Sequence, residues 1–180
     1  DTNLPAAGMY RRVDPEADNF AGEKICITMP FPTAPGAATT IEELHAMGCE
    51  KFIICGAARS IKNGSAVGKI IVPTAAVRDE GTSYHYLEPA REVEGNKETL
   101  KVVTDGLERL GIPYTLGKTW TTDAMYRETP EMIAKEEKKG VLLLRWKQLI
   151  FAVSKYYGIS LAQLLYTGDD VSGEQWDERS

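Results

Sequence analysis

The run "KIIVPTAAV", residues 69–77, is apolar at almost every position and shows no alternation between polar and apolar residues. A strand that is covered on one face alternates, whereas a strand that is covered on both faces is apolar throughout. This run therefore predicts a strand buried between two layers, and with it a layered α/β domain. The other runs of this kind are "KICITM" (24–29), "KFIICG" (51–56) and "AQLLYTG" (162–168).

Helical patterns lie between these runs. In "TTIEELHAMG" (39–48), Thr40 and Glu43 form a candidate capping box and Gly48 is the expected stop. The spacing of leucine and valine predicts a second helix over 96–110. Two more helices are expected, in "TPEMIAKEEKKG" (129–140) and in "FAVSKYYG" (151–158).

Composition restricts the class of protein. A chain of 180 residues with 43% hydrophobic residues is expected to form one domain. The net charge of −5 argues against a nucleic-acid-binding surface. Three cysteines, an odd number beside apolar runs, indicate a reducing compartment, so we expect a cytoplasmic protein. We expect no membrane partner either, because no apolar stretch has membrane-spanning length and the start does not read as a signal peptide.

Three segments could carry chemistry. The stretch 78–96 is long, polar and aromatic, and reads either as a functional loop or as an ordered crossover. The stretch 117–131 reads either as a stacking floor with an arginine or as a hydrophobic edge with a surface ion pair. Asp169 and Asp170 follow an apolar strand, at the end where α/β sheets present ligand groups, although a helix cap would account for one of them. Metal-ligand spacing and glycine-rich phosphate loops are absent from the sequence.

Three long segments, "VGKIIVPTAAVRDEGTSYHYLEPAREVE" (67–94), "GKTWTTDAMYRETPE" (117–131) and "QLLYTGDDVSGEQWDER" (163–179), resemble the nucleoside phosphorylase family, closest to its uridine phosphorylase branch. The resemblance implies a three-layer α/β/α fold with a mixed, partly barrel-like central sheet. It also implies one domain over 1–180 that lacks the family's usual N-terminal strand and loop and its C-terminal helix. Self-association to a dimer or a hexamer is implied as well.

The resemblance implies phosphate-dependent cleavage of uridine or a related nucleoside, with inorganic phosphate as co-substrate and no metal or organic cofactor. Met125 and Tyr126 would lie against the base, and Arg127 would reach its polar edge. Asp169 corresponds to the acid that protonates the base in purine-specific relatives. Gly56 and Ala57 belong to the turn that lines the phosphate site, and Arg78 is a candidate phosphate ligand because Ile54 stands where some relatives have an arginine.

The expected sugar clamp departs from the family pattern. Relatives read Val-Glu-Met-Glu where this chain has "LRWK", so Arg145, Trp146 and Lys147 occupy the substrate-binding positions. An ammonium group donates to a sugar hydroxyl but cannot accept from it. The stretch "LLRWKQL" (143–149) is what a Val-Val-Glu-Met-Glu-Thr-Ala coding stretch yields when it is read one nucleotide out of frame. We interpret it as a local frame error, for which residues 58–61 give a weaker parallel.

Two other functions stay open at this point. A catalytically impaired homologue would keep the fold and the assembly without the clamp. A nucleoside hydrolase of the same superfamily would use water in place of phosphate.

Overall fold

The computed structural model describes residues 16–20, 22–30, 33–61, 70–144 and 149–170. The chain divides into two compact units, Asp1–Phe31 and Pro32–Ser180. The described part of the first unit is an antiparallel hairpin of β1 (Glu16–Phe20) and β2 (Glu23–Ile27). The predicted organisation as one domain over 1–180 stays a prediction.

The second unit is built on a mixed sheet of six strands in the order β5-β4-β6-β7-β3-β8. Strands β4 and β8 also pair, so five of the strands close into a barrel, and β5 is an outer strand on β4. The strands are β3 (Lys51–Ser60), β4 (Ile70–Asp79), β5 (Glu92–Glu94), β6 (Tyr114–Thr122), β7 (Val141–Leu144) and β8 (Ser160–Asp170).

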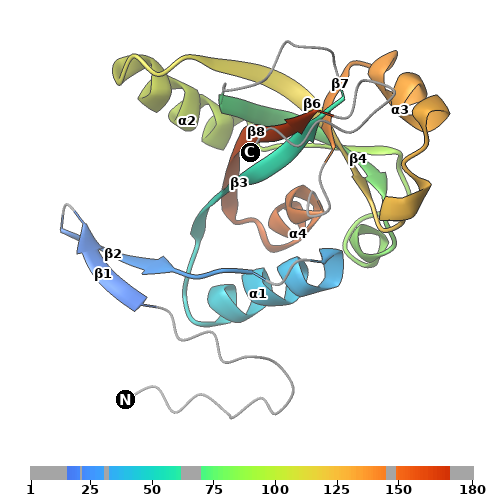
Figure 1. Ribbon diagram of the computed structural model, residues 1–180. Coiled ribbons are helices and arrows are strands. Elements are labelled where there is room, and N and C mark those ends of the chain that lie inside the picture. The colour runs from blue at the N-terminus through green and yellow to red at the C-terminus, as the bar shows by residue number, and fades with distance from the viewer. Residues whose placement is uncertain (1–15, 21, 31–32, 62–69, 145–148, 171–180) are drawn as a thin grey trace. The chain divides into compact units, whose positions relative to one another are not determined.

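Four α-helices of the described chain surround this sheet (Figure 1). One, α2, packs against β4 and β8, while α4 packs against β8 and against α1, and α3 contacts β7. Helices therefore lie on both sides of a mixed, partly closed sheet, which confirms the predicted fold class. The helices are α1 (Ala34–Ala46), α2 (Lys97–Arg109), α3 (Pro130–Glu137) and α4 (Ile150–Tyr157).

The apolar run "KIIVPTAAV" (69–77) forms most of β4. Ile71, Val72 and Val77 are fully buried, as a strand covered on both faces requires. Near the start of β4, Ile71 packs with residues from β3, β7 and β8. Near the end of the same strand, Val77 packs with residues from β6 and β7. The largest apolar cluster lies between the sheet and the pair α1 and α4.

The predicted start of the first helix is wrong. The helix begins at Ala34, and its N-cap is Thr33, whose hydroxyl accepts the N–H of Gly36 at 3.2 Å. Thr40 lies inside the helix and donates to the Gly36 carbonyl at 2.9 Å. The small residues before Thr40 are buried because they pack closely in the cluster with α4, and this tertiary packing extends the helix.

The other three helices begin within one residue of the predicted starts at 96, 129 and 151. Asn96 caps α2 and Thr129 caps α3, each with its side chain on a backbone N–H, and Gly158 ends α4 at φ +67°. In the part of the chain that the structure describes, no helix is both long enough and apolar enough to cross a membrane.

Candidate functional site

One line of paired residues crosses all five strands of the barrel. Val77 of β4 pairs with Trp120 of β6, which pairs with Leu144 of β7. Leu144 pairs with Arg59 of β3, and Arg59 pairs with Asp169 of β8. Segments up to 110 residues apart in the sequence (59 to 169) therefore meet at one level of the barrel, which we call the site level.

The site level brings together several of the predicted site segments. Asp169 is there through its backbone pairing with Arg59, just after a register shift between Ala58 and Arg59. Leu144 is the last described residue before the predicted sugar clamp, whose residues Arg145, Trp146 and Lys147 lie outside the described part of the chain. Strand β6 ends at Thr122, two residues beyond Trp120 of this line, and the connection from β6 begins there.

The predicted base-binding residues form the short 3-10 helix η2 (Met125–Arg127) after β6. Its backbone is held by the Arg127 N–H on the Ala124 carbonyl at 2.8 Å. The side chain of Tyr126 is 95% exposed, and Arg127 is exposed too. Both side chains are therefore accessible to a ligand at the outside of the barrel end, and they contribute little to the core.

Arg78 has a structural environment that its sequence position did not reveal. It is 2% exposed and donates to the Ser83 hydroxyl at 2.8 Å, to the Glu88 carbonyl at 2.8 Å and to the Leu87 carbonyl at 3.1 Å. Its guanidinium also lies over the ring of Tyr84 at 4.3 Å. Arg78 thus fixes the loop that follows β4, including η1 (Thr82–His85). Its phosphate-binding role stays a prediction.

The two predicted turn residues, Gly56 and Ala57, are part of β3. Gly56 pairs with Leu165 and Ala57 with Tyr166, so both lie before the register shift that leads to Arg59. The sequence placed a turn here, whereas the strand continues to Ser60. Ala57 and Gly56 therefore lie two and three positions before Arg59, the residue of β3 at the site level.

Sequence reasoning missed an ion pair beside the site level. Arg59 Nη1 lies 3.3 Å from Glu128 Oε2, and the Glu128 side chain is only 7% exposed. The two residues are 69 positions apart, so no local pattern signals the pair.

A second polar network joins the ends of β4 and β6 to α3. Trp120 Nε1 donates to Asp79 Oδ2 at 3.1 Å, and Arg91 donates to Asp79 Oδ1 at 2.8 Å. Arg91 also reaches Glu136 at 3.1 Å, to which Lys139 donates at 2.7 Å. Two acids and two bases alternate, so the network carries no net charge.

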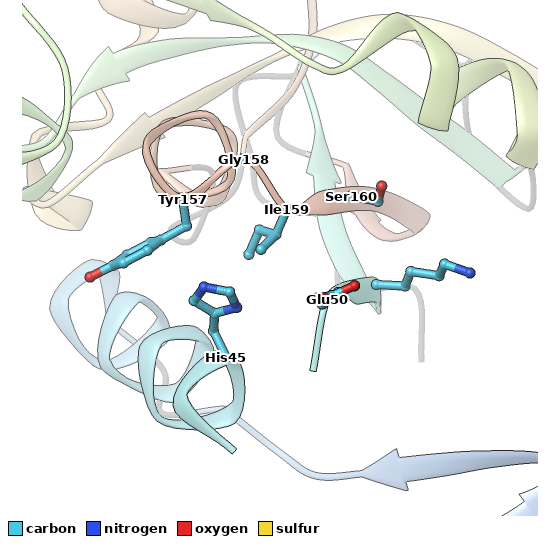
Figure 2. Close-up of a pocket in the computed structure, with 7 residues that line it drawn as sticks. His45, Glu50, Tyr157, Gly158, Ile159 and Ser160 are labelled. Carbon is cyan, nitrogen blue, oxygen red and sulfur yellow. The ribbon is translucent and has the colours of Figure 1, made fainter. Parts of the chain in front are cut away.

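A cavity of about 230 Å³ lies away from the site level, where β3 and β8 begin. Figure 2 shows His45 and Tyr157 facing each other beside Ile159, with ring centroids 5.1 Å apart. His45 Nδ1 is 3.1 Å from the Cys49 carbonyl, and the Tyr157 hydroxyl donates to Glu42 at 2.9 Å. These polar atoms already take part in hydrogen bonds of the fold. None of the predicted site residues is among the residues that line this cavity.

Glu42 also accepts the hydroxyl of Tyr86 at 3.0 Å. Burial, together with the hydrogen bond to this carboxylate, raises the pKa of Tyr86 to about 12. The pKa of Tyr157 is raised as well, chiefly by its own hydrogen bond to Glu42. Within the described ranges, no three or more His, Cys, Asp or Glu residues are grouped as metal ligands would be.

Comparison with known proteins relates this arrangement to one family. Residues 18–145 match the sequence profile of the Phosphorylase superfamily. The uridine phosphorylase of Thermococcus kodakarensis is 32% identical over 117 residues, which are 65% of this chain and 42% of that protein. The guanosine phosphorylase of Halorubrum lacusprofundi is 26% identical over 159 residues, which are 87% of this chain and 66% of that protein.

A solved structure has the same fold. The uridine phosphorylase from Vibrio fischeri superposes with a TM-score of 0.77 at 27% identity, over 84% of this chain and 63% of that chain. The chain thus spans 42% to 66% of the length of these three relatives.

Proposed function

Since this chain belongs to the Phosphorylase superfamily, we propose that it cleaves the N-glycosidic bond of uridine or a related nucleoside with inorganic phosphate. The products are the free base and ribose 1-phosphate. The observation that carries the proposal is the family match over residues 18–145, a range that contains four of the five strands crossing the site level.

The reaction is a substitution at the anomeric carbon of the ribose. A phosphate oxygen forms the new bond while the bond to the base nitrogen breaks, and the base leaves with the electron pair. Catalysis then requires a fixed sugar and groups that stabilise the negative charge developing on the base. Arg127 is the candidate for that charge, and Asp169 is the candidate for donating a proton to the base.

The predicted binding residues divide between the two substrates. Met125 and Tyr126 are proposed to lie against the base from η2. Gly56, Ala57 and Arg78 are the candidates on the phosphate side, although three donors of Arg78 are held by the loop after β4. No metal or organic cofactor takes part in this scheme.

The test is turnover of uridine, inosine and adenosine, each with and without phosphate. Turnover that depends on phosphate supports the proposal, and the preferred nucleoside identifies the base. Cleavage without phosphate would identify a hydrolase instead. Arg127→Ala and Asp169→Asn should each lower kcat/KM by about 10²- to 10³-fold. Lys101→Met is the matched control, because it removes only an exposed ion pair with Asp105 on α2.

A second candidate is a catalytically impaired homologue that keeps the fold. It is favoured by one feature of the sequence, Arg145 and Lys147 at positions where the resemblance to the family implies carboxylates. A folded protein without turnover of any of the three nucleosides would support this candidate.

Self-association and location complete the proposal. We expect a dimer or a hexamer in the cytoplasm, with no nucleic-acid or membrane partner. Light scattering of the purified protein measures the assembly directly, and a monomer at micromolar concentration would contradict that part.

A further inference from the structure

We propose that Arg59 and Glu128 are positioning residues that hold η2 at the site level, and this inference rests on the proposed function. The pair joins β3, one of the five strands of the site level, to the segment that carries Tyr126 and Arg127. Neither residue was a predicted site residue, Arg59 was noted only within the weaker frame parallel of residues 58–61, and neither is proposed to touch the substrate.

The segment needs such a link because its own backbone gives it little support. After the single turn of η2, Glu128 has φ −74° and ψ 65°, and the Thr129 N–H donates to the Arg127 carbonyl at 2.8 Å. These values describe an inverse γ-turn with Glu128 at its centre. One turn of 3-10 helix followed by a three-residue turn has few hydrogen bonds, so its position depends on contacts with the barrel.

The burial of Glu128 makes its link to the barrel strong. Its side chain is 7% exposed, whereas that of Arg59 is 26% exposed. A carboxylate buried to this degree requires charged or hydrogen-bonding partners, and the removal of one partner costs far more than the loss of a surface ion pair. Surface pairs such as Lys101–Asp105, with side chains 74% and 55% exposed, have no comparable effect.

The position of Arg59 explains what the pair controls. Arg59 is the register partner of Leu144 on one side and of Asp169 on the other. A bond from this residue to Glu128 sets the distance between η2 and the strand end that carries Asp169. In the proposed reaction Arg127 and Asp169 act on the same base, so a shift of η2 of about 1 Å would lower turnover by as much as about 10²-fold.

The experiment compares Arg59→Met, Arg59→Lys and Glu128→Gln with the unaltered chain, and it compares the charge-reversed double variant Arg59→Glu/Glu128→Arg with Arg59→Glu and Glu128→Arg alone. Two readouts are taken on each folded protein: the steady-state constants for the nucleoside and for phosphate, and the hydrogen exchange of the backbone over 124–129. Lys101→Met is the matched control. Far-UV circular dichroism and Tm identify any variant that does not fold.

Arg59→Met and Glu128→Gln are expected to speed exchange over 124–129 by about 10-fold or more, while exchange in β4 and β6 stays unchanged. They should also raise the KM for the nucleoside, or lower kcat, by about 10- to 100-fold and leave the KM for phosphate within about 2-fold. Arg59→Lys should show smaller changes in both readouts, since it keeps the charge. The double variant should lie closer to the unaltered chain in both readouts than Arg59→Glu or Glu128→Arg alone.

The two readouts separate this inference from the proposed function. If the unaltered chain turns over no nucleoside, the proposed function fails, and exchange over 124–129 still decides the role of the pair. Unchanged exchange in Arg59→Met and in Glu128→Gln would overturn the inference, even in an active enzyme. An equal rise in the KM values for nucleoside and phosphate would overturn it too, because the effect would then not be confined to η2.

Discussion

Trp120 donates its indole N–H to the carboxylate of Asp79 at 3.1 Å, and this bond ties the end of β6 to the end of β4. Trp120 has no exposed surface, so the hydrogen bond is made in the core. The second oxygen of Asp79 accepts from Arg91 at 2.8 Å. One carboxylate therefore satisfies a buried donor and also anchors the network that leads to α3.

Trp120→Phe should lower the free energy of unfolding by about 2–3 kcal/mol, because it removes the hydrogen bond and leaves a cavity beside Val77. Urea unfolding followed by circular dichroism measures this change. Lys101→Met should stay within about 0.5 kcal/mol of the unaltered chain, as expected for an exposed pair. An unfolding midpoint of Trp120→Phe equal to that of the control would contradict this prediction. Neither the lost hydrogen bond to Asp79 nor the cavity would then have destabilised the fold.

Gln163 on β8 presents the opposite case, a polar side chain with no exposed surface. Among the residues that the structure describes, neither its amide nitrogen nor its amide oxygen has a hydrogen-bond partner. Gln163→Leu should raise the free energy of unfolding by about 1–2 kcal/mol, since it replaces two unsatisfied atoms with apolar surface of similar volume. Calorimetry should show a rise in Tm of about 2–8 °C.

Gln163→Ala provides the control for that prediction. It removes the same polar atoms but leaves a cavity, and it should lower Tm. A fall in Tm for Gln163→Leu as well would mean that the amide has a partner, such as an ordered water, inside the barrel.

The sequence predicted what depends on local pattern and missed what depends on distant pairing. The start of the apolar strand β4, the starts of α2 and α3 and the glycine at 158 that ends α4 depend on local signals, and each was found within one residue of its predicted place. The start of α1 was misplaced because Thr33 supplies an earlier cap and the small residues that follow it pack in the cluster with α4. Strand β6 was overlooked, since its polar threonines gave no apolar run.

The candidate site shows the same division. The segments that converge on the site level were identified, but their register was not, because it depends on a shift between Ala58 and Arg59. The pair Arg59–Glu128 is a contact over 69 positions, and nothing in either local segment specifies it. The use of Arg78 by its own loop was invisible for a related reason: its acceptors are the backbone carbonyls of Leu87 and Glu88.

The shared carboxylate of Glu42 predicts a dependence on pH. The pKa of Tyr86 is about 12 in the folded chain, compared with about 10 when the chain is unfolded. Between these values the unfolded state has lost the phenolic proton and the folded state retains it, so stability falls as pH rises. The contribution is complete below about pH 10 and is lost through about pH 12.

Urea midpoints at pH 9 and at pH 11.5 measure that loss, and Tyr86→Phe should make the decline shallower. Absorbance at 295 nm should show at least one phenol of the folded chain that ionises only near pH 12. A decline of equal slope in Tyr86→Phe would assign the effect to other groups, including Tyr157.

The last prediction concerns the sugar clamp, where the chain carries Arg145, Trp146 and Lys147. A ribose held by its hydroxyls needs acceptors, and two cations supply only donors. The triple variant Arg145→Glu/Trp146→Met/Lys147→Glu should therefore raise kcat/KM for the nucleoside by about 10²-fold or more, with phosphate present. Trp146→Met alone is the matched control, because it changes the packing and leaves both cations in place. If the triple variant were no more active than this control, the clamp would not lie at these positions, and the frame-error interpretation would lose its chemical support. Resequencing of the gene across codons 143–149 tests that interpretation independently of activity.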